Sequence, residues 1–265
     1  MIFAFINLLC LSFAPKINIK DLYRKIRVGI VSYLNTKPLL YGIQHSKIVQ
    51  SVELIIDYPA RIAAMLLQDE IDIGLVPVAI LPKMREYFIN TNYCIGCDGP
   101  VGSVCIFSDV PLDKVSHILL DYQSKTSTEL ARILLREYWK VSPELSDGGI
   151  DFIDHIKGST AGLVIGDRAL EQRRISPFRY DLGEAWKALT GLPFVFAAWI
   201  SNKKLDDAFV KMFDKANELG VRNIDQILID LGHNFFDLRQ YFEKYISYQL
   251  DDAKKEGLRL FLQKL

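Results

Sequence analysis

The sequence carries no excess of charge of either sign. Lysine and arginine together number 32, and aspartate and glutamate also number 32, so the formal net charge is zero. Proteins that bind nucleic acid or anionic membranes through their overall field carry a clear positive excess. We therefore expect no nucleic-acid partner and no stable membrane association. An anionic ligand would have to be held by local cations and backbone N–H groups.

Cysteine is scarce as well, with four residues in a chain of 265. Cys94 and Cys97 form a C-x-x-C pattern, which occurs in redox motifs and in zinc sites. No second such pattern and no nearby pair of histidines completes a metal site, and the pattern does not open a helix. We predict reduced thiols in a strand, no bound metal and a reducing compartment.

Beyond its first residues, the chain has no apolar run long enough to cross a bilayer. Residues 1–14, MIFAFINLLCLSFA, are strongly apolar, but no lysine or arginine precedes them and no clear cleavage site follows. An export signal, an interfacial segment and a start codon assigned too far upstream are three interpretations. We favour the last, because a folded pattern begins only near Ile26. Residues 1–25 are thus predicted to lie outside the fold.

The order of apolar segments predicts an α/β fold. Strands are expected at 28–31, 52–56 and 71–76, with helices after Pro38 and over 60–68. This βαβαβ order favours a parallel sheet. A short helix is expected over 80–88. The extended run 93–108 is interrupted by glycine and proline, which mark a close backbone approach, so we interpret it as a strand that leaves one lobe, passes a ligand and enters a second sheet.

The remaining segments predict a second lobe and a return to the first. Strands are expected at 118–120 and 161–165, helices at 130–139 and 168–172, and a loop at 142–149. The apolar run 192–200 can return to the first sheet, and helices are expected over 205–219, 223–231 and 237–261. The chain thus crosses twice between the two lobes, which predicts a bilobal clamshell that binds its ligand in the hinge cleft. We predict one lobe from residues 26–104 and 198–265 and the other from residues 105–197.

Two strand ends carry hydroxyl groups to the start of a helix. Asn35 or Thr36 can cap the helix that Pro38 opens, and Thr126 with Glu129 has the spacing of a capping box. Ligands of open α/β sheets bind beyond strand ends, and helix N-termini favour anions. The spacing therefore fits two walls of an anion site and fits simple helix caps equally well. For Asp167, a helix cap is the favoured role.

Five segments carry a resemblance to a known family. They are SYLNTKPL at 32–39, DGPVGSV at 98–104, SKTS at 124–127, IGD at 165–167 and DLGEAWKALTGLPFVFAAW at 181–199. In this order they resemble the chorismate dehydratases of the futalosine route to menaquinone, the MqnA branch of the MqnA/MqnD family. The sister branch is expected to have a cysteine- and proline-containing loop in place of the first segment.

The resemblance implies a fold and a reaction, and the chemistry of that reaction then suggests site residues within the five segments. The fold is similar to that of type II periplasmic binding proteins, and the family is cytoplasmic and uses no metal or organic cofactor. The reaction converts chorismate to 3-[(1-carboxyvinyl)oxy]benzoate and water. The candidate catalytic residues are Asn35 and Ser103, and the candidate substrate-binding residues are Ser32, Thr36, Thr126, Ser127 and Asp167. Trp186 and Trp199 are expected in the core.

The proton acceptor is open at this stage, because none of the four histidines lies in the five segments. Asp167 and the substrate's own enolpyruvyl carboxylate are the candidates, and we favour the carboxylate. A clamshell solute-binding protein for a small anion is the second interpretation of the whole chain, and the apolar N-terminus favours it. A regulator's effector domain would need a preceding helix-turn-helix segment, which the sequence lacks.

Overall fold

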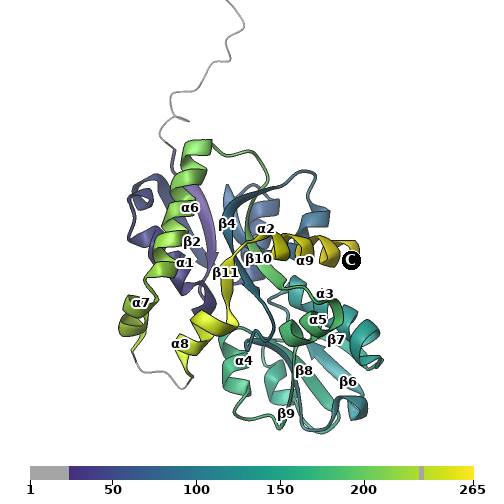
Figure 1. The fold of residues 1–265 in the computed structure, drawn as a ribbon. Coiled ribbons are helices and arrows are strands. Elements are labelled where there is room, and N and C mark those ends of the chain that lie inside the picture. Colours follow the sequence, from purple (N-terminus) through teal and green to yellow (C-terminus); the bar gives the residue numbers. More distant parts are fainter. Residues whose placement is uncertain (1–23, 233–235) are drawn as a thin grey trace, which may run out of the picture.

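Two α/β lobes, each built on its own sheet, make up the protein (Figure 1). The computed structural model describes residues 24–232 and 236–265. The first sheet has six strands in the order β11-β4-β10-β3-β1-β2, and the second has five in the order β7-β6-β8-β5-β9. No helix within the described ranges is long and apolar enough to cross a membrane.

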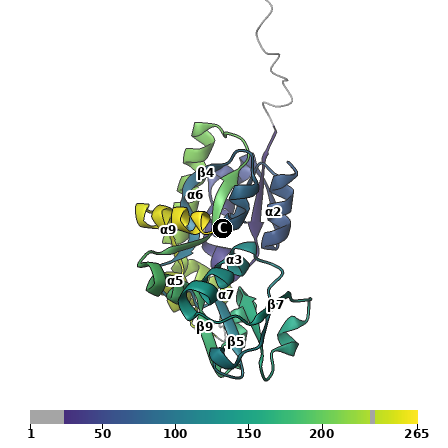
Figure 2. The ribbon, with the colours of Figure 1, turned by 90° about the vertical axis from the view of Figure 1, so that its right-hand side faces the viewer.

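The first lobe begins with the predicted parallel unit. It consists of β1 (Ile26–Val31), α1 (Lys37–Gln44), β2 (Val52–Asp57), α2 (Pro59–Leu67) and β3 (Ile73–Pro77). The strand β1 lies between β2 and β3 and is parallel to both. Because the chain steps to opposite sides of β1, α1 and α2 cover opposite faces of the sheet. Figure 2 shows α2 on one side and α6 (Asp207–Arg222), which packs on α1, on the other.

Two neighbouring strands on the other side of β3 from β1 lead toward the second lobe and back. β4 (Phe88–Cys97) and β10 (Phe194–Ser201) pair antiparallel in the first sheet, whereas β5 (Val104–Ser108) lies in the second. Residues 98–103 therefore connect the lobes. Phe194 already pairs with Cys97, so β10 belongs to the first sheet from its first residue rather than from residue 198.

A single carboxylate fixes the connection between the lobes. Asp181 accepts hydrogen bonds from the backbone N–H groups of Val101 and Gly102, at 3.1 and 2.8 Å. The same carboxylate caps α5 (Leu182–Thr190) through the N–H groups of Gly183 and Glu184. The segments DGPVGSV and DLGEAW thus meet at one buried side chain.

The second lobe contains both parallel and antiparallel pairs. Its remaining elements are β6 (His117–Leu120), α3 (Lys125–Leu134), β7 (Glu144–Asp147), β8 (Thr160–Ile165), α4 (Asp167–Gln172) and β9 (Phe178–Asp181). β6 is parallel to β7 and β8, and β5 is antiparallel to β8 and β9. Trp186 on α5 and Trp199 on β10 are fully buried, which confirms their predicted place in the core.

Three predicted elements are wrong. Residues 78–83 form a 3₁₀ turn that contains Pro82, and β4 starts at Phe88, so no helix spans 80–88. The expected loop 142–149 contains the edge strand β7. The expected helix 237–261, which follows α7 (Ile224–Leu231), is broken into α8 (Leu238–Gln240), a π-helical turn over Tyr241–Tyr245, β11 (Ser247–Gln249) and α9 (Asp252–Gln263). β11 extends here because it pairs with β4.

A buried carboxylate at the end of the first sheet stabilises the fold. The side chain of Asp72 is 3% exposed and pairs with Arg24, Arg27 and Lys203 at 2.7–3.2 Å. Burial alone would raise the pKa of Asp72, but hydrogen bonds from Arg27 and Lys203 outweigh this effect and hold the pKa below its ordinary value. The carboxylate therefore contributes stability above its unfolded pKa of about 3.9, and this contribution is lost as the pH falls below that value.

We expect Asp72→Asn to lower the free energy of unfolding by about 2 kcal/mol at pH 7, because three cations lose a charged acceptor. Below about pH 4 the Asp72 carboxylate of the unfolded wild-type protein gains a proton that the folded protein does not yet bind, so the difference between the two proteins should shrink. Urea denaturation of both proteins at pH 7 and at pH 3 measures this. A difference that is the same at the two pH values would contradict the charge-based explanation.

Candidate functional site

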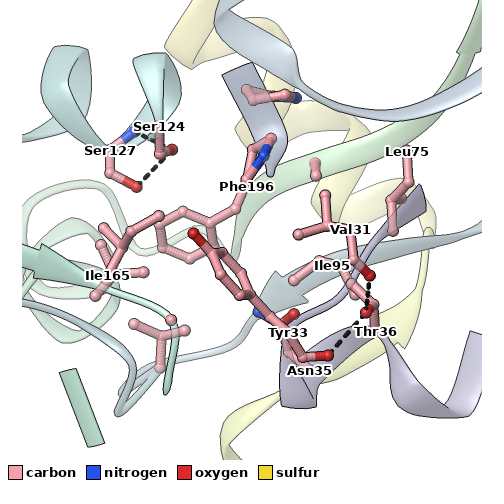
Figure 3. A pocket seen from close by; sticks show the side chains of 16 residues that line it. Val31, Tyr33, Asn35, Thr36, Leu75, Ile95, Ser124, Ser127, Ile165 and Phe196 are labelled. Carbon is pink, nitrogen blue, oxygen red and sulfur yellow. Dashed lines mark hydrogen bonds between the residues drawn. The ribbon is translucent and has the colours of Figure 1, made fainter. Parts of the chain in front are cut away.

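A cavity of about 530 Å³, part of it open to solvent, is lined by both lobes (Figure 3). Val31, Asn35 and Thr36 line it from the first lobe, and Ser124, Ser127 and Ile165 line it from the second. The other lining residues, such as Phe196 on β10, are largely apolar. Among the described residues, no lysine, arginine, aspartate or glutamate lines this cavity. An anion inside it would have to be held by hydroxyl, amide and N–H groups.

The second-lobe wall is the N-terminus of α3. Ser124, not Thr126, is the N-cap, and its Oγ accepts a hydrogen bond from the N–H of Ser127 at 3.3 Å. The Oγ atoms of Ser124 and Ser127 are 3.0 Å apart, and both residues line the cavity. A helix of ten residues that begins at this wall provides free N–H groups and a positive dipole end for an anion.

Thr126 has a different environment from Ser127. It is fully buried and is absent from the cavity wall, and its Oγ1 accepts a hydrogen bond from the N–H of Ala79 at 3.1 Å. Its hydroxyl therefore ties α3 to the 3₁₀ turn of the first lobe. Sequence reasoning took Thr126 as the cap because Thr126-x-x-Glu129 fits a capping box. The overlapping Ser124-x-x-Ser127 pattern, which the structure uses, was the signal that was missed.

The first-lobe wall follows β1. The side chain of Asn35 is half-buried and lines the cavity, and its backbone carbonyl accepts a hydrogen bond from the Tyr248 hydroxyl at 3.0 Å. Thr36 also lines the cavity, but its Oγ1 faces the carbonyl oxygens of Val31 and Tyr33, at 2.5 and 2.8 Å. Neither the Thr36 nor the Asn35 side chain caps α1. Ser32 is exposed and lies outside the cavity lining.

Ser103 and Asp167 are not among the residues that line the cavity, although each is next in the chain to one that does. Ser103 is fully buried on the connection between the lobes, where its Oγ accepts a hydrogen bond from the Tyr241 hydroxyl at 2.7 Å. Asp167 is the first residue of α4, and Gly166 occupies the cap position. The carboxylate of Asp167 instead accepts a hydrogen bond from the N–H of Leu34, at 3.0 Å, and so joins the two lobes. Burial raises the pKa of Asp167, against the opposing effects of that N–H and of Lys37.

Tyr33 is a cavity residue that sequence reasoning missed. It belongs to the first lobe, and its hydroxyl donates a hydrogen bond to the side-chain oxygen of Gln123 in the second. A Cβ on Gly166 would lie only 3.0 Å from the Tyr33 ring, so the glycine admits the ring. Burial raises the pKa of the Tyr33 phenol. Figure 3 shows this ring in the middle of the cavity, where it forms a second contact between the lobes.

The thiols lie outside the cavity lining. Cys94, Cys97 and Cys105 are buried and unpaired, and burial raises the pKa of each, so all three are protonated at neutral pH. Cys10 lies outside the described residues. Within the part of the chain that the structure describes, no group of three or more histidine, cysteine, aspartate and glutamate side chains is placed to hold a metal ion.

Two lobes that share a lined cleft and are joined by two connecting segments define a clamshell of the periplasmic-binding-protein class. Solved structures agree with this class. A protein from Archaeoglobus fulgidus matches 91% of this chain and 96% of its own with a TM-score of 0.69 at 14% identity. The aliphatic sulphonate binding protein SsuA from Escherichia coli matches 91% and 92% with a TM-score of 0.55 at 12% identity. The predicted fold class is thus confirmed.

Sequence comparison identifies the family within this class. The family model described as menaquinone biosynthesis matches residues 26–265, and the chain belongs to this family. A chorismate dehydratase from Thermus thermophilus is 25% identical over 264 residues, which cover 90% of this chain and 94% of the relative. The resemblance drawn from the five sequence segments is therefore confirmed. The match begins at the residue where β1 starts.

Proposed function

We propose that this protein is a chorismate dehydratase, a lyase that converts chorismate to 3-[(1-carboxyvinyl)oxy]benzoate and water in menaquinone biosynthesis. The observation that carries the proposal is the cavity itself. It has one uncharged amide, Asn35, on one wall and a serine pair at a helix N-terminus on the other, in a member of the menaquinone biosynthesis family. This arrangement suits a small dianion that has to be oriented rather than activated by a cofactor.

The chemistry explains why so few reactive groups are needed. The ring carbon that bears the enolpyruvyl ether loses a hydrogen, the neighbouring carbon loses its hydroxyl, and the ring becomes aromatic. The electron pair of the broken C–H bond enters the ring as the C–O bond breaks, and the proton and the hydroxide leave as water. The gain of aromaticity drives the reaction, so the protein has to supply position, a proton acceptor and support for the leaving hydroxyl.

The residues divide these tasks between the lobes. Ser127 and Ser124, with the first N–H groups of α3, hold one carboxylate. The Asn35 amide faces the reacting edge of the ring and orients the leaving hydroxyl, while Ser103 supports that side from the connection between the lobes. The hydroxyls of Thr36 and Thr126 already contact backbone groups, so we assign these two residues to wall support.

The proton acceptor is best supplied by the substrate. Among the described residues, no histidine or carboxylate lines the cavity, and the Asp167 carboxylate already accepts the N–H of Leu34. The enolpyruvyl carboxylate of chorismate is joined to the ether oxygen through one vinyl carbon, so it can reach the hydrogen on the ring carbon that bears the ether. Held by the serines of α3, it would act as a general base within the substrate itself.

Proton NMR of purified protein mixed with chorismate tests the proposal. We expect the ring-diene signals to be replaced by aromatic signals while the two enolpyruvyl methylene protons persist. Heat-denatured protein serves as the control for spontaneous rearrangement. Unchanged chorismate in the presence of the folded protein would overturn the proposal.

A clamshell solute-binding protein is the second candidate, favoured by the fold that the chain shares with SsuA. It predicts a protein found outside the cytoplasm, with a small anion recovered from it chemically unchanged. The dehydratase proposal places the protein in the cytoplasm, where Cys94, Cys97 and Cys105 stay reduced. Cell fractionation followed by identification of the bound ligand separates the two candidates.

A further inference from the structure

A π-helical turn brings a buried tyrosine next to the candidate catalytic residues. Residues Tyr241–Tyr245 form this turn between α8 and β11, closed by a hydrogen bond from the N–H of Ile246 to the Tyr241 carbonyl at 3.0 Å. Turns of this type are rare in proteins, but those that occur lie frequently at functional sites. The Tyr241 side chain is fully buried, and the ring of Tyr245 packs over Gly102 on the connection between the lobes.

The Tyr241 hydroxyl joins the two residues that the sequence predicts as catalytic. It donates a hydrogen bond to Ser103 Oγ at 2.7 Å, and the side chain of Asn35 lies close enough to the phenol to lower its pKa, against the larger effect of burial. Asn35 comes from the first lobe and Ser103 from the connection between the lobes. Tyr248, on β11, donates a hydrogen bond from its hydroxyl to the Asn35 backbone carbonyl. The C-terminal segment thus contacts Asn35 through both its side chain and its backbone.

Ser103 keeps its own hydroxyl proton, because Tyr241 is the donor in the hydrogen bond between them. A phenol has one proton to donate, and Tyr241 gives it to Ser103 Oγ. The Ser103 hydroxyl then has its own proton left for another acceptor. Burial raises the pKa of Tyr241, so the phenol keeps its proton at neutral pH and remains able to donate it. The lone pairs of the phenol oxygen are left to accept a hydrogen bond from a neighbouring donor such as the Asn35 amide.

We propose that Tyr241 is a positioning residue for the dehydration, which keeps Ser103 as a hydrogen-bond donor and fixes the orientation of the Asn35 amide. This inference rests on the proposed dehydratase function. Tyr241 lies outside the cavity lining, so it acts through Ser103 and Asn35 rather than on the substrate. Its hydroxyl, and not its ring, carries the role.

Tyr241→Phe removes only that hydroxyl. We expect kcat on chorismate to fall by about 10- to 100-fold while KM changes by less than about threefold, because misplaced reacting groups slow the chemical step more than binding. Tyr245→Phe is the matched control: within the described residues its hydroxyl makes no hydrogen bond, and we expect wild-type kinetics. Circular dichroism and thermal unfolding report whether each variant is folded.

A double-mutant cycle separates positioning from a structural role. If Tyr241 acts through Ser103 and Asn35, adding Tyr241→Phe to Ser103→Ala should lower kcat by a smaller factor than Tyr241→Phe does in the wild type. The inference would be overturned if the kcat losses of the two single variants multiply in full in the double variant. It would also be overturned if Tyr241→Phe keeps the wild-type kcat. A wild-type protein that leaves chorismate unchanged would instead overturn the proposed function itself.

A second measurement covers the case in which Tyr241→Phe does not fold. Site-specific replacement of Tyr241 by 3-fluorotyrosine keeps the hydroxyl and makes the phenol more acidic. If phenol donation to Ser103 matters, the more acidic phenol should change kcat at neutral pH while KM stays as in the wild type. A kcat equal to that of the wild type would count against the positioning role.

Discussion

Replacing Asn35 with alanine is expected to lower kcat on chorismate by at least about 100-fold, because the variant loses the polar group that orients the leaving hydroxyl. Asn35 is the one amide on the cavity wall among the described residues, and its half-buried side chain projects from the first lobe. The fold should survive, since the structural contact at this residue is made by its backbone carbonyl with Tyr248.

Appearance of the aromatic product, followed by its ultraviolet absorbance, measures this loss in the Asn35→Ala protein. Gln44→Ala is the matched control, because Gln44 carries an exposed amide at the end of α1, away from the cavity. We expect wild-type turnover for the control and native unfolding curves for both variants. Turnover within about threefold of the wild type in Asn35→Ala would remove Asn35 from the catalytic site.

The elements that sequence reasoning predicted well depend on local signals. The strands β1, β2 and β8 are apolar runs with clear ends, and Pro38 marks the first turn of α1. The two crossing runs were visible because glycine and proline interrupt the first and proline leads the second. Such signals lie within a few residues of the element that they define, so one chain is enough to find them.

The residues that were missed depend on contacts far apart in the chain. Tyr241 lies 138 residues from Ser103, and Tyr33 lies 90 residues from Gln123. From the sequence alone, Tyr241 looks like an ordinary residue of an amphipathic helix, and Tyr33 looks like an ordinary loop residue. The π-helical turn that carries Tyr241 exists because β11 pairs with the edge of β4, which a helical spacing pattern over 237–261 cannot reveal.

Local competition between caps explains the remaining error. Ser124 and Thr126 are both acceptable N-caps, and each has a suitable residue three positions later. Tertiary structure decides between them, because Thr126 Oγ1 contacts the N–H of Ala79 and is not free to cap α3. Because α3 is capped at Ser124 and not at Thr126, Ser124 lies on the cavity wall and Thr126 does not.

Asp167 offers the sharpest test of where the substrate proton goes. Its carboxylate accepts the N–H of Leu34 and so links the second lobe to the first. We expect Asp167→Ala to lower kcat/KM by about 10- to 100-fold, since a hydrogen bond to a charged acceptor contributes about 1.5–3 kcal/mol. The loss reflects a weaker closed state of the clamshell, because this carboxylate lies outside the cavity lining.

Asp167→Asn separates that contact from proton transfer. Its amide oxygen can still accept the Leu34 N–H, but an amide is no general base at neutral pH. If the enolpyruvyl carboxylate takes the proton, Asp167→Asn should keep turnover within about threefold of the wild type while Asp167→Ala does not. Equal and severe losses in both variants would make Asp167 the proton acceptor, and the base would then belong to the protein and not to its substrate.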